Sequence, residues 1–182
     1  MGNALTSCRV STLGRWLPRM VAAMGIVVLP VSARVSVAQG PSAEDLADGL
    51  RLFRQKGDCQ ACHGWAGDGR KMDTQMPDGA NLRTTRLGRS GLVLAIKCGR
   101  PGRGMPAYDR LAYSDGRCFD MKQADLARQG LQLPDPPSTL QPREIDLLVD
   151  FLLARIVGQG PMDRAKCIEF WGSDVEVCSE FK

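Results

Sequence analysis

Two cysteines and the chain's one histidine stand together in the pentapeptide Cys59-Gln60-Ala61-Cys62-His63. Thiols at this spacing can form thioether bonds with the two vinyl groups of one porphyrin, and a histidine directly after them can bind the iron. The pattern therefore predicts one covalently attached haem c, held by Cys59 and Cys62, with His63 as the proximal axial ligand. Because there is no second histidine, a protein ligand on the opposite haem face must be another residue type.

Two other uses of a Cys-x-x-Cys pair stay open at this stage. A zinc site needs further cysteine or histidine ligands at set spacing, and the remaining cysteines form no second pair. A thioredoxin-like redox pair is expected within a βαβ pattern, and the downstream sequence shows none. Haem attachment is the interpretation that the spacing favours most.

The second axial ligand is predicted from the methionines that follow residue 38, which are Met72, Met76, Met105, Met121 and Met162. Met105 lies in a Gly-Met-Pro loop, where glycine lets the backbone approach a flat ligand and proline fixes the chain direction. It follows His63 by 42 residues, which is enough chain to reach the other haem face. Met105 is therefore the predicted distal ligand and Met121 the second candidate. A thioether ligand favours Fe(II), and two filled axial positions favour electron transfer over haem catalysis.

Residues 1–38 have the pattern of a secretory signal peptide. Three arginines without acidic residues precede an apolar run of 12 residues, Met20 to Val31, and Ser36-Val37-Ala38 offers the small residues of a cleavage site. The run is shorter than the roughly 20 residues of a membrane span, although a retained anchor and cleavage after Ala33 stay open. We expect export to the periplasm, cleavage after Ala38, and no stable membrane span after signal removal.

Loss of this segment changes the charge of the protein. Four of the 24 basic residues and none of the 20 acidic residues precede Ala38, so 20 of each sign remain. The formal net charge of +4 therefore belongs to the signal segment, and binding to nucleic acid is not expected.

Six basic residues and no acidic residue lie between Gly79 and Tyr108: Arg83, Arg86, Arg89, Lys97, Arg100 and Arg103. Because Met105 lies in the same stretch, we expect these charges near an exposed haem edge. Two interpretations stay open there, namely steering of an acidic redox partner and binding of haem propionates by one or two arginines.

Four cysteines remain after the signal and the haem motif are set aside: Cys98, Cys118, Cys167 and Cys178. An exported protein meets an oxidising compartment, and four cysteines allow three pairings. Short loops favour Cys98–Cys118 and Cys167–Cys178 as disulfides, with buried free thiols as the alternative.

Apolar periodicity and capping residues predict an all-α protein. A first helix is expected between Ser42 and Gly57, with Ser42 and Asp45 near a capping box. Over 90–97 periodicity alone leaves helix or strand open, and the position between two loops favours a short helix. A weaker helix is expected over 124–127, and the strongest from Pro142 to about Gly158. We divide the chain into a signal peptide (1–38), a domain (39–158) with an insertion at about 109–139, and a cysteine-containing tail (159–182).

Together these motifs resemble the monohaem class I c-type cytochromes, over roughly residues 42–158. The resemblance rests on Gly49-x-x-x-Phe53, the haem motif, Gly79-Ala80-Asn81-Leu82, Gly104-Met105-Pro106 and the last helix with Leu148, Phe151 and Leu152. It implies a cytochrome c fold, in which three to five helices surround one covalent haem and the first and last helices cross beside it. It also implies a hydrogen bond from His63 to the backbone carbonyl of Ala80.

In size and layout the chain resembles periplasmic cytochromes that accept electrons from quinoprotein alcohol dehydrogenases. The resulting expectation is an electron carrier, not an enzyme, that passes electrons from a dehydrogenase toward a terminal oxidase. Two alternatives stay open. One is a haem enzyme, peroxidase or gas-binding, with a displaceable sixth ligand, and the other is a permanent haem subunit of a dehydrogenase complex.

Overall fold

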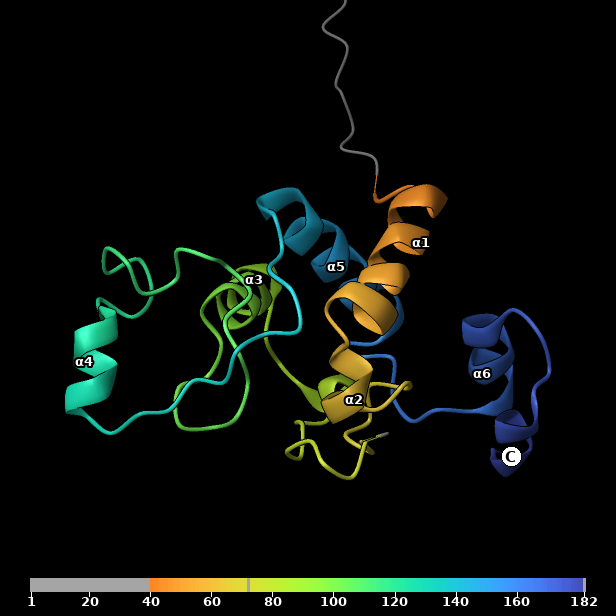
Figure 1. Ribbon diagram of the computed structural model, residues 1–182. Coiled ribbons are helices and arrows are strands. Elements are labelled where there is room, and N and C mark those ends of the chain that lie inside the picture. Colours follow the sequence, from red (N-terminus) through yellow and green to blue (C-terminus); the bar gives the residue numbers. More distant parts are fainter. Residues whose placement is uncertain (1–39, 72, 182) are drawn as a thin grey trace, which may run out of the picture. The chain divides into compact units, whose positions relative to one another are not determined.

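The computed structural model describes residues 40–71 and 73–181 (Figure 1), so the expected signal peptide and Met72 lie outside the described residues. The α-helices, in chain order, are α1 (Ala43–Arg51), α2 (Cys59–His63), α3 (Arg89–Cys98), α4 (Gln123–Arg128), α5 (Pro142–Arg155) and α6 (Arg164–Trp171). A π-helical turn spans Leu52–Lys56, and 3₁₀ turns span Leu82–Thr84 and Glu176–Glu180. The described residues contain no β-strand, which confirms the all-α prediction. The described part of the chain forms six α-helices, where three to five were expected around one haem.

The first helix begins as its sequence predicts. The Ser42 Oγ accepts a hydrogen bond from the Asp45 N–H at 3.1 Å, and the Asp45 carboxylate accepts one from the Ser42 N–H at 3.1 Å, which completes a capping box. A π-helical turn, Leu52–Lys56, continues α1 and ends at Gly57, whose N–H donates to the Leu52 carbonyl oxygen. The π-helical turn before Gly57 was not predicted, because one extra residue per turn leaves no mark in a short apolar pattern.

Helices α1 and α5 pack side by side (Figure 1) and build the main core. The rings of Phe53 and Phe151 have centroids 5.8 Å apart, which fits the crossing that the family resemblance implies. At one end, the Lys56 Nζ lies 2.7 Å from the Glu144 carboxylate. The buried residues of this core are Leu52, Phe53, Leu92, Ile96, Tyr108, Leu140, Ile145, Leu148, Val149, Phe151, Leu152 and Ile156.

Helix α5 is the strongest predicted helix, and its boundaries follow from its ends. Pro142 occupies the first turn, where backbone N–H groups have no partner within the helix, so the missing N–H of proline costs no hydrogen bond. The apolar face predicted from periodicity is buried, with Leu148 and Val149 fully inaccessible to solvent. Gly158 follows with φ of 73°, a conformation that suits glycine and stops the helix.

The insertion after α3 has a second core of its own. Cys98 at the end of α3 is bonded to Cys118, and the buried Ala112, Tyr113 and Leu126 pack around this disulfide. The Tyr113 hydroxyl donates to the Cys98 carbonyl oxygen at 2.7 Å, so the side chain is both buried and satisfied. The disulfide that loop length favoured is therefore confirmed, and it joins α3 to the insertion.

The tail packs against the segment that directly follows the Cys59–His63 motif. The Trp65 ring lies 5.3 Å from the Phe170 ring and 5.6 Å from the Trp171 ring, centroid to centroid. The Arg54 guanidinium lies 4.4 Å from the centroid of Trp171, a cation–π contact. The second predicted disulfide, Cys167–Cys178, is also confirmed and closes the tail on itself.

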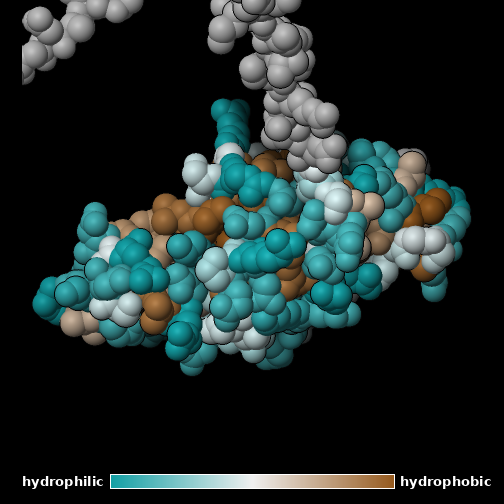
Figure 2. Space-filling view, turned by 90° about the horizontal axis from the view of Figure 1, so that it is seen from above, coloured by the Kyte–Doolittle hydropathy of each residue, from teal (hydrophilic) through white to brown (hydrophobic). Residues whose placement is uncertain are grey.

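Hydrophobic residues reach the surface among hydrophilic ones, as Figure 2 shows for one face. The large hydrophobic side chains that are more than a third exposed are Met76, Leu87, Leu94, Leu111 and Phe119. Within the described ranges, no helix combines the length and apolar character needed to cross a membrane.

Candidate haem site

The Cys-Gln-Ala-Cys-His motif forms the one-turn helix α2. Residues three apart lie on the same side of a helix, so Cys59 and Cys62 face the same way, with His63 one position further. The preceding residue, Asp58, has φ of 44°, a left-handed conformation that is uncommon for a residue with a side chain. The chain therefore turns sharply between Gly57 and Cys59, which separates α2 from the preceding helix.

Cys59 and Cys62 are free thiols, not partners in a disulfide. The pKa of Cys59 is raised to about 12, mainly by burial and to a lesser extent by the nearby carboxylate of Asp58. The same two causes raise the pKa of Cys62. A redox dithiol or a zinc site requires thiolates, which this environment disfavours, whereas a thioether carries no charge. The surroundings of both sulfurs thus fit covalent attachment of an apolar group.

His63 is oriented by the backbone. Its Nδ1 donates a hydrogen bond to the carbonyl oxygen of Ala80, with the two atoms 2.8 Å apart, as the family resemblance implies. Burial lowers the pKa of His63, and the Ala80 carbonyl opposes that shift. The ring is therefore neutral at neutral pH with its proton on Nδ1, which leaves the Nε2 lone pair available to a metal.

The close approach of the Ala80 segment to the motif depends on Gly79. A Cβ atom placed on Gly79 would lie 2.6 Å from the Cys62 carbonyl oxygen and 2.8 Å from the His63 Nδ1. No real side chain fits at those distances, so glycine is required. The Gly79 N–H donates to the Cys62 carbonyl oxygen at 3.1 Å and fixes the two segments together.

Cys59, Cys62 and His63 line a cavity of about 1400 Å³. Its inner wall is formed by apolar side chains of the main core, which are Phe53, Leu82, Leu92, Ile96, Tyr108, Leu148 and Leu152. Protein interiors are close-packed and leave few voids larger than a water molecule. A hollow of this volume with an apolar inner wall, beside two free thiols and a neutral imidazole, therefore fits a large flat apolar group bonded to the motif.

The methionines differ in their position relative to this cavity. Met105 lines the cavity, is half-buried and packs against the main core. Met76 also lines the cavity but is 37% exposed. Met121 does not line it; its backbone pairs with that of Cys118 and its side chain packs against the second core. Met162 lies beside a separate, smaller cavity of about 230 Å³. The arrangement brings Met105 together with His63 and leaves Met121 apart.

The outer wall of the cavity comes partly from the loop 100–106, which the sequence assigned to the site through Met105. The rest comes from the insertion, which sequence reasoning did not assign to the site: α4 and the residues after it, including Leu126, Leu131, Leu133 and Pro134. Nothing in the irregular, proline-rich sequence of the insertion signals this role. It arises from a long-range contact that a local pattern does not encode.

In the folded protein, only some residues of the predicted basic stretch are exposed and unpaired. Arg83 is only 4% exposed and donates to backbone carbonyls, so it is not a surface charge. Arg89 pairs with Asp150, and Lys97 lies 3.9 Å from Asp109. The other three residues of the stretch stay exposed and make no ion pair within the described residues.

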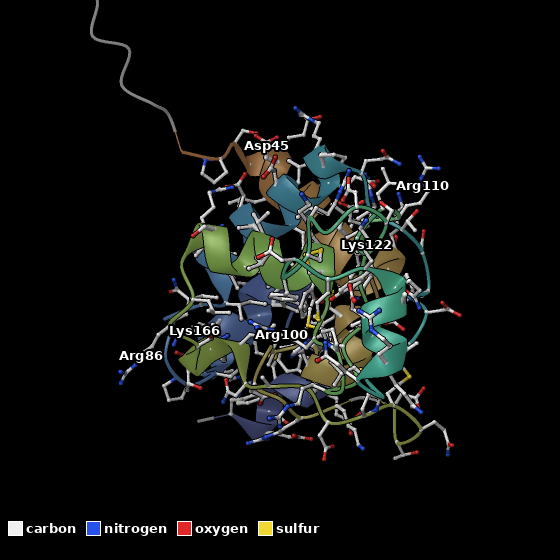
Figure 3. All side chains as sticks on the ribbon, turned by 90° about the vertical axis from the view of Figure 1, so that its left-hand side faces the viewer. Asp45, Arg86, Arg100, Arg110, Lys122 and Lys166 are labelled. Carbon is white, nitrogen blue, oxygen red and sulfur yellow. A yellow bond between two sulfur atoms is a disulfide. The ribbon has the colours of Figure 1, made fainter. Side chains whose placement is uncertain are left out.

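These three exposed arginines are Arg86, Arg100 and Arg103. Arg100 and Arg103 line the cavity, and Figure 3 shows Arg86 extending away from the ribbon and Arg100 between α3 and α4 in that view. The surface charge available near the site is thus half of what the sequence suggests. Two of its three members are also in a position to bind acid groups of a cavity ligand.

Among residues 40–71 and 73–181, no three His, Cys, Asp or Glu side chains are grouped so as to hold a metal ion directly. The thiols and imidazole of α2 thus line a common cavity without converging on one point, unlike the ligands of a tetrahedral zinc site. Comparison with protein-family models, curated proteins and solved structures finds no match to the chain.

Proposed function

We propose that this protein is a periplasmic electron carrier with one covalently bound haem c and His63/Met105 axial ligation, built on a cytochrome c fold. The observation that carries the proposal is the joint lining of one large apolar cavity by Cys59, Cys62, His63 and Met105. Bound haem c supplies a one-electron Fe(III)/Fe(II) couple. We propose no catalytic residue in this chain.

The chain's own residues would have distinct tasks in this carrier. Cys59 and Cys62 would hold the porphyrin through thioethers, and the Ala80 carbonyl would keep the His63 ring in one tautomer and orientation. The apolar inner wall would exclude water, and Met105 would supply a soft donor that favours the reduced state. Arg100 or Arg103 would neutralise propionates at the cavity rim.

The proposal is tested with the exported protein matured with haem. Denatured holoprotein should keep its haem, and Cys59→Ala/Cys62→Ala should abolish that retention. The oxidised wild type should show the far-red methionine–iron band, and the reduced form should resist carbon monoxide. Met105→Ala should lose the band and bind carbon monoxide, whereas Met121→Ala, the matched control, should do neither. Rapid carbon monoxide binding by the wild type would contradict the carrier and favour a peroxidase or gas-binding haem enzyme.

The proposed partners are a quinoprotein dehydrogenase as donor and a terminal oxidase as acceptor. If Arg86 steers an acidic donor, the rate of reduction should fall as ionic strength rises. Arg86→Glu should slow the reaction at low salt, whereas Arg110→Glu, an exposed arginine outside the cavity lining, should not. A rate independent of salt would rule out steering. Isolation only as a tight complex with a dehydrogenase would favour the permanent-subunit alternative.

A further inference from the structure

The loop that carries Met105 is a tight, self-bonded turn. The Arg100 N–H donates to the Met105 carbonyl oxygen at 2.9 Å, and the Arg103 N–H donates to the Arg100 carbonyl oxygen at 2.9 Å. Gly102 and Gly104 have φ of 72° and 77°. These bonds define the shape of the turn, but none of them fixes the tip of the turn to the rest of the protein.

The insertion contacts the tip of this turn at Gly102. The Gly102 N–H donates to the Gln132 carbonyl oxygen at 2.8 Å. A Cβ on Gly102 would lie 3.1 Å from the Leu131 Cδ2, which means that the Leu131 side chain is packed against the loop backbone. Leu131, Gln132 and Met105 all line the same cavity.

The insertion can hold the turn because it is itself anchored. The Leu131 N–H donates to the Leu126 carbonyl oxygen at 3.0 Å, and Leu126 is only 1% exposed within the second core. That core is tied covalently to α3 through Cys98–Cys118. A continuous set of contacts thus runs from the disulfide through Leu126 to Leu131, and from there to the loop of Met105.

We propose that Leu131 and Gln132 are positioning residues that hold the 100–106 loop so that the Met105 side chain stays directed into the cavity. The inference rests on the proposed function, in which Met105 is the distal ligand. The insertion then supports the ligand loop from outside. Without the Leu131 and Gln132 contacts the tip of the self-bonded turn is held less firmly, because only the packing of Met105 on the main core and of Gly104 beside Pro77 remains. Gln132 contacts the loop through its backbone, whereas Leu131 does so through its side chain, which substitution can remove.

The experiment compares Leu131→Ala with two controls in the haem-loaded protein. Met121→Ala weakens the same second core but does not line the cavity, and Leu111→Ala removes an exposed leucine of the insertion. Carbon monoxide binding to the reduced protein and the temperature at which the far-red band disappears are measured for each. Leu131→Ala should bind carbon monoxide about tenfold faster and lose the band at lower temperature, since a tenfold shift in loop opening corresponds to about 1.4 kcal/mol.

The volume-conserving variant Leu131→Met should restore wild-type values, which separates a packing role from failure to fold. Equal behaviour of Leu131→Ala and Met121→Ala would overturn the inference while leaving the carrier intact. A wild-type protein that lacks the far-red band would overturn the proposed function, and this inference with it.

Discussion

The carbonyl oxygen of Leu147 occupies the space that a side chain at Gly49 would need. A Cβ built on Gly49 would lie 2.4 Å from that oxygen and 2.5 Å from the Phe151 Cβ. Helices α1 and α5 therefore approach backbone to backbone at this point. Glycine is retained in the middle of α1 because the close crossing outweighs its cost in helix stability, which is about 1 kcal/mol relative to alanine.

Gly49→Ala should therefore destabilise the protein, although alanine is the better helix former. Separating the two helices disturbs the main core, and we expect a loss of about 2–4 kcal/mol in the free energy of unfolding. Gly88→Ala is the control, since a Cβ there meets nothing within 4 Å, and should cost less than about 1 kcal/mol. Chemical denaturation measures the free energy of unfolding of both variants. Equal values would contradict the close approach of α1 and α5 at Gly49.

Arg83→Lys should be strongly destabilising despite the conserved charge. The guanidinium donates to the carbonyl oxygens of Ala66, Gln159 and Gly160, which join the segment after the motif to the end of α5. A lysine cannot reproduce this fork of donors, so we expect a loss of about 2–3 kcal/mol. Arg86→Lys, at an exposed site, should change thermal stability by less than about 0.5 kcal/mol. Similar melting temperatures for the two variants would argue against the structural role of Arg83.

Glu144→Gln should cost stability at neutral pH only. Burial alone would raise the pKa of Glu144, but hydrogen bonds from Lys56 and from the Gln141 backbone hold the pKa below its usual 4.5. The stabilisation is therefore complete above pH 4.5 and is lost as pH falls through the lower folded pKa. Because the pair is partly exposed, the loss at pH 7 should be about 0.5–1 kcal/mol.

Melting curves of wild type and Glu144→Gln at pH 7 and near pH 3 test this dependence. The two proteins should differ at pH 7 and converge in acid. Glu180→Gln, which alters an exposed carboxylate outside any ion pair of the described residues, should match wild type at both values. A difference that persists in acid would show that the effect of Glu144 does not come from its charge.

Phe119→Asn should stabilise the insertion. Phe119 has φ of 56° and is 39% exposed, in a turn closed by the Met121 N–H and the Cys118 carbonyl oxygen. A bulky residue in the left-handed region is strained, whereas asparagine tolerates it, so a gain of about 0.5–1 kcal/mol is expected. Leu111→Asn removes a similarly exposed side chain without relieving strain and should give no gain. A thermal shift of equal size in both variants would contradict this explanation.

Local signals in the sequence were sufficient for most helices and both disulfides. The capping residues Ser42 and Asp45 place the start of α1, and the apolar period with Pro142 places α5, because both signals act within a few residues. Short loops were enough to pair Cys98 with Cys118. The prediction of the site residues rested on motif spacing in the same way.

Features that depend on distant contacts were missed. Helix α6 carries no apolar stripe, and its aromatic residues meet Trp65 from more than a hundred positions away. The sequence places Arg83 in a basic stretch near an exposed haem edge. Its burial could not be predicted, because its carbonyl partners come from elsewhere in the chain. The outer wall formed by the insertion belongs to the same group, since Leu131 meets the loop of Met105 only in the folded state.

The pairing of the first and last helices of the domain has a consequence for the rate of folding. Lys56 and Glu144 are 88 residues apart, and the main core forms only when that long loop closes. The Cys98–Cys118 bond removes 20 of those residues from the loop, which lowers the closure cost by only about 0.2 kcal/mol. Formation of the main core therefore waits for this loop closure, and α1 stays without its packing partner until nearly the whole domain has been synthesised.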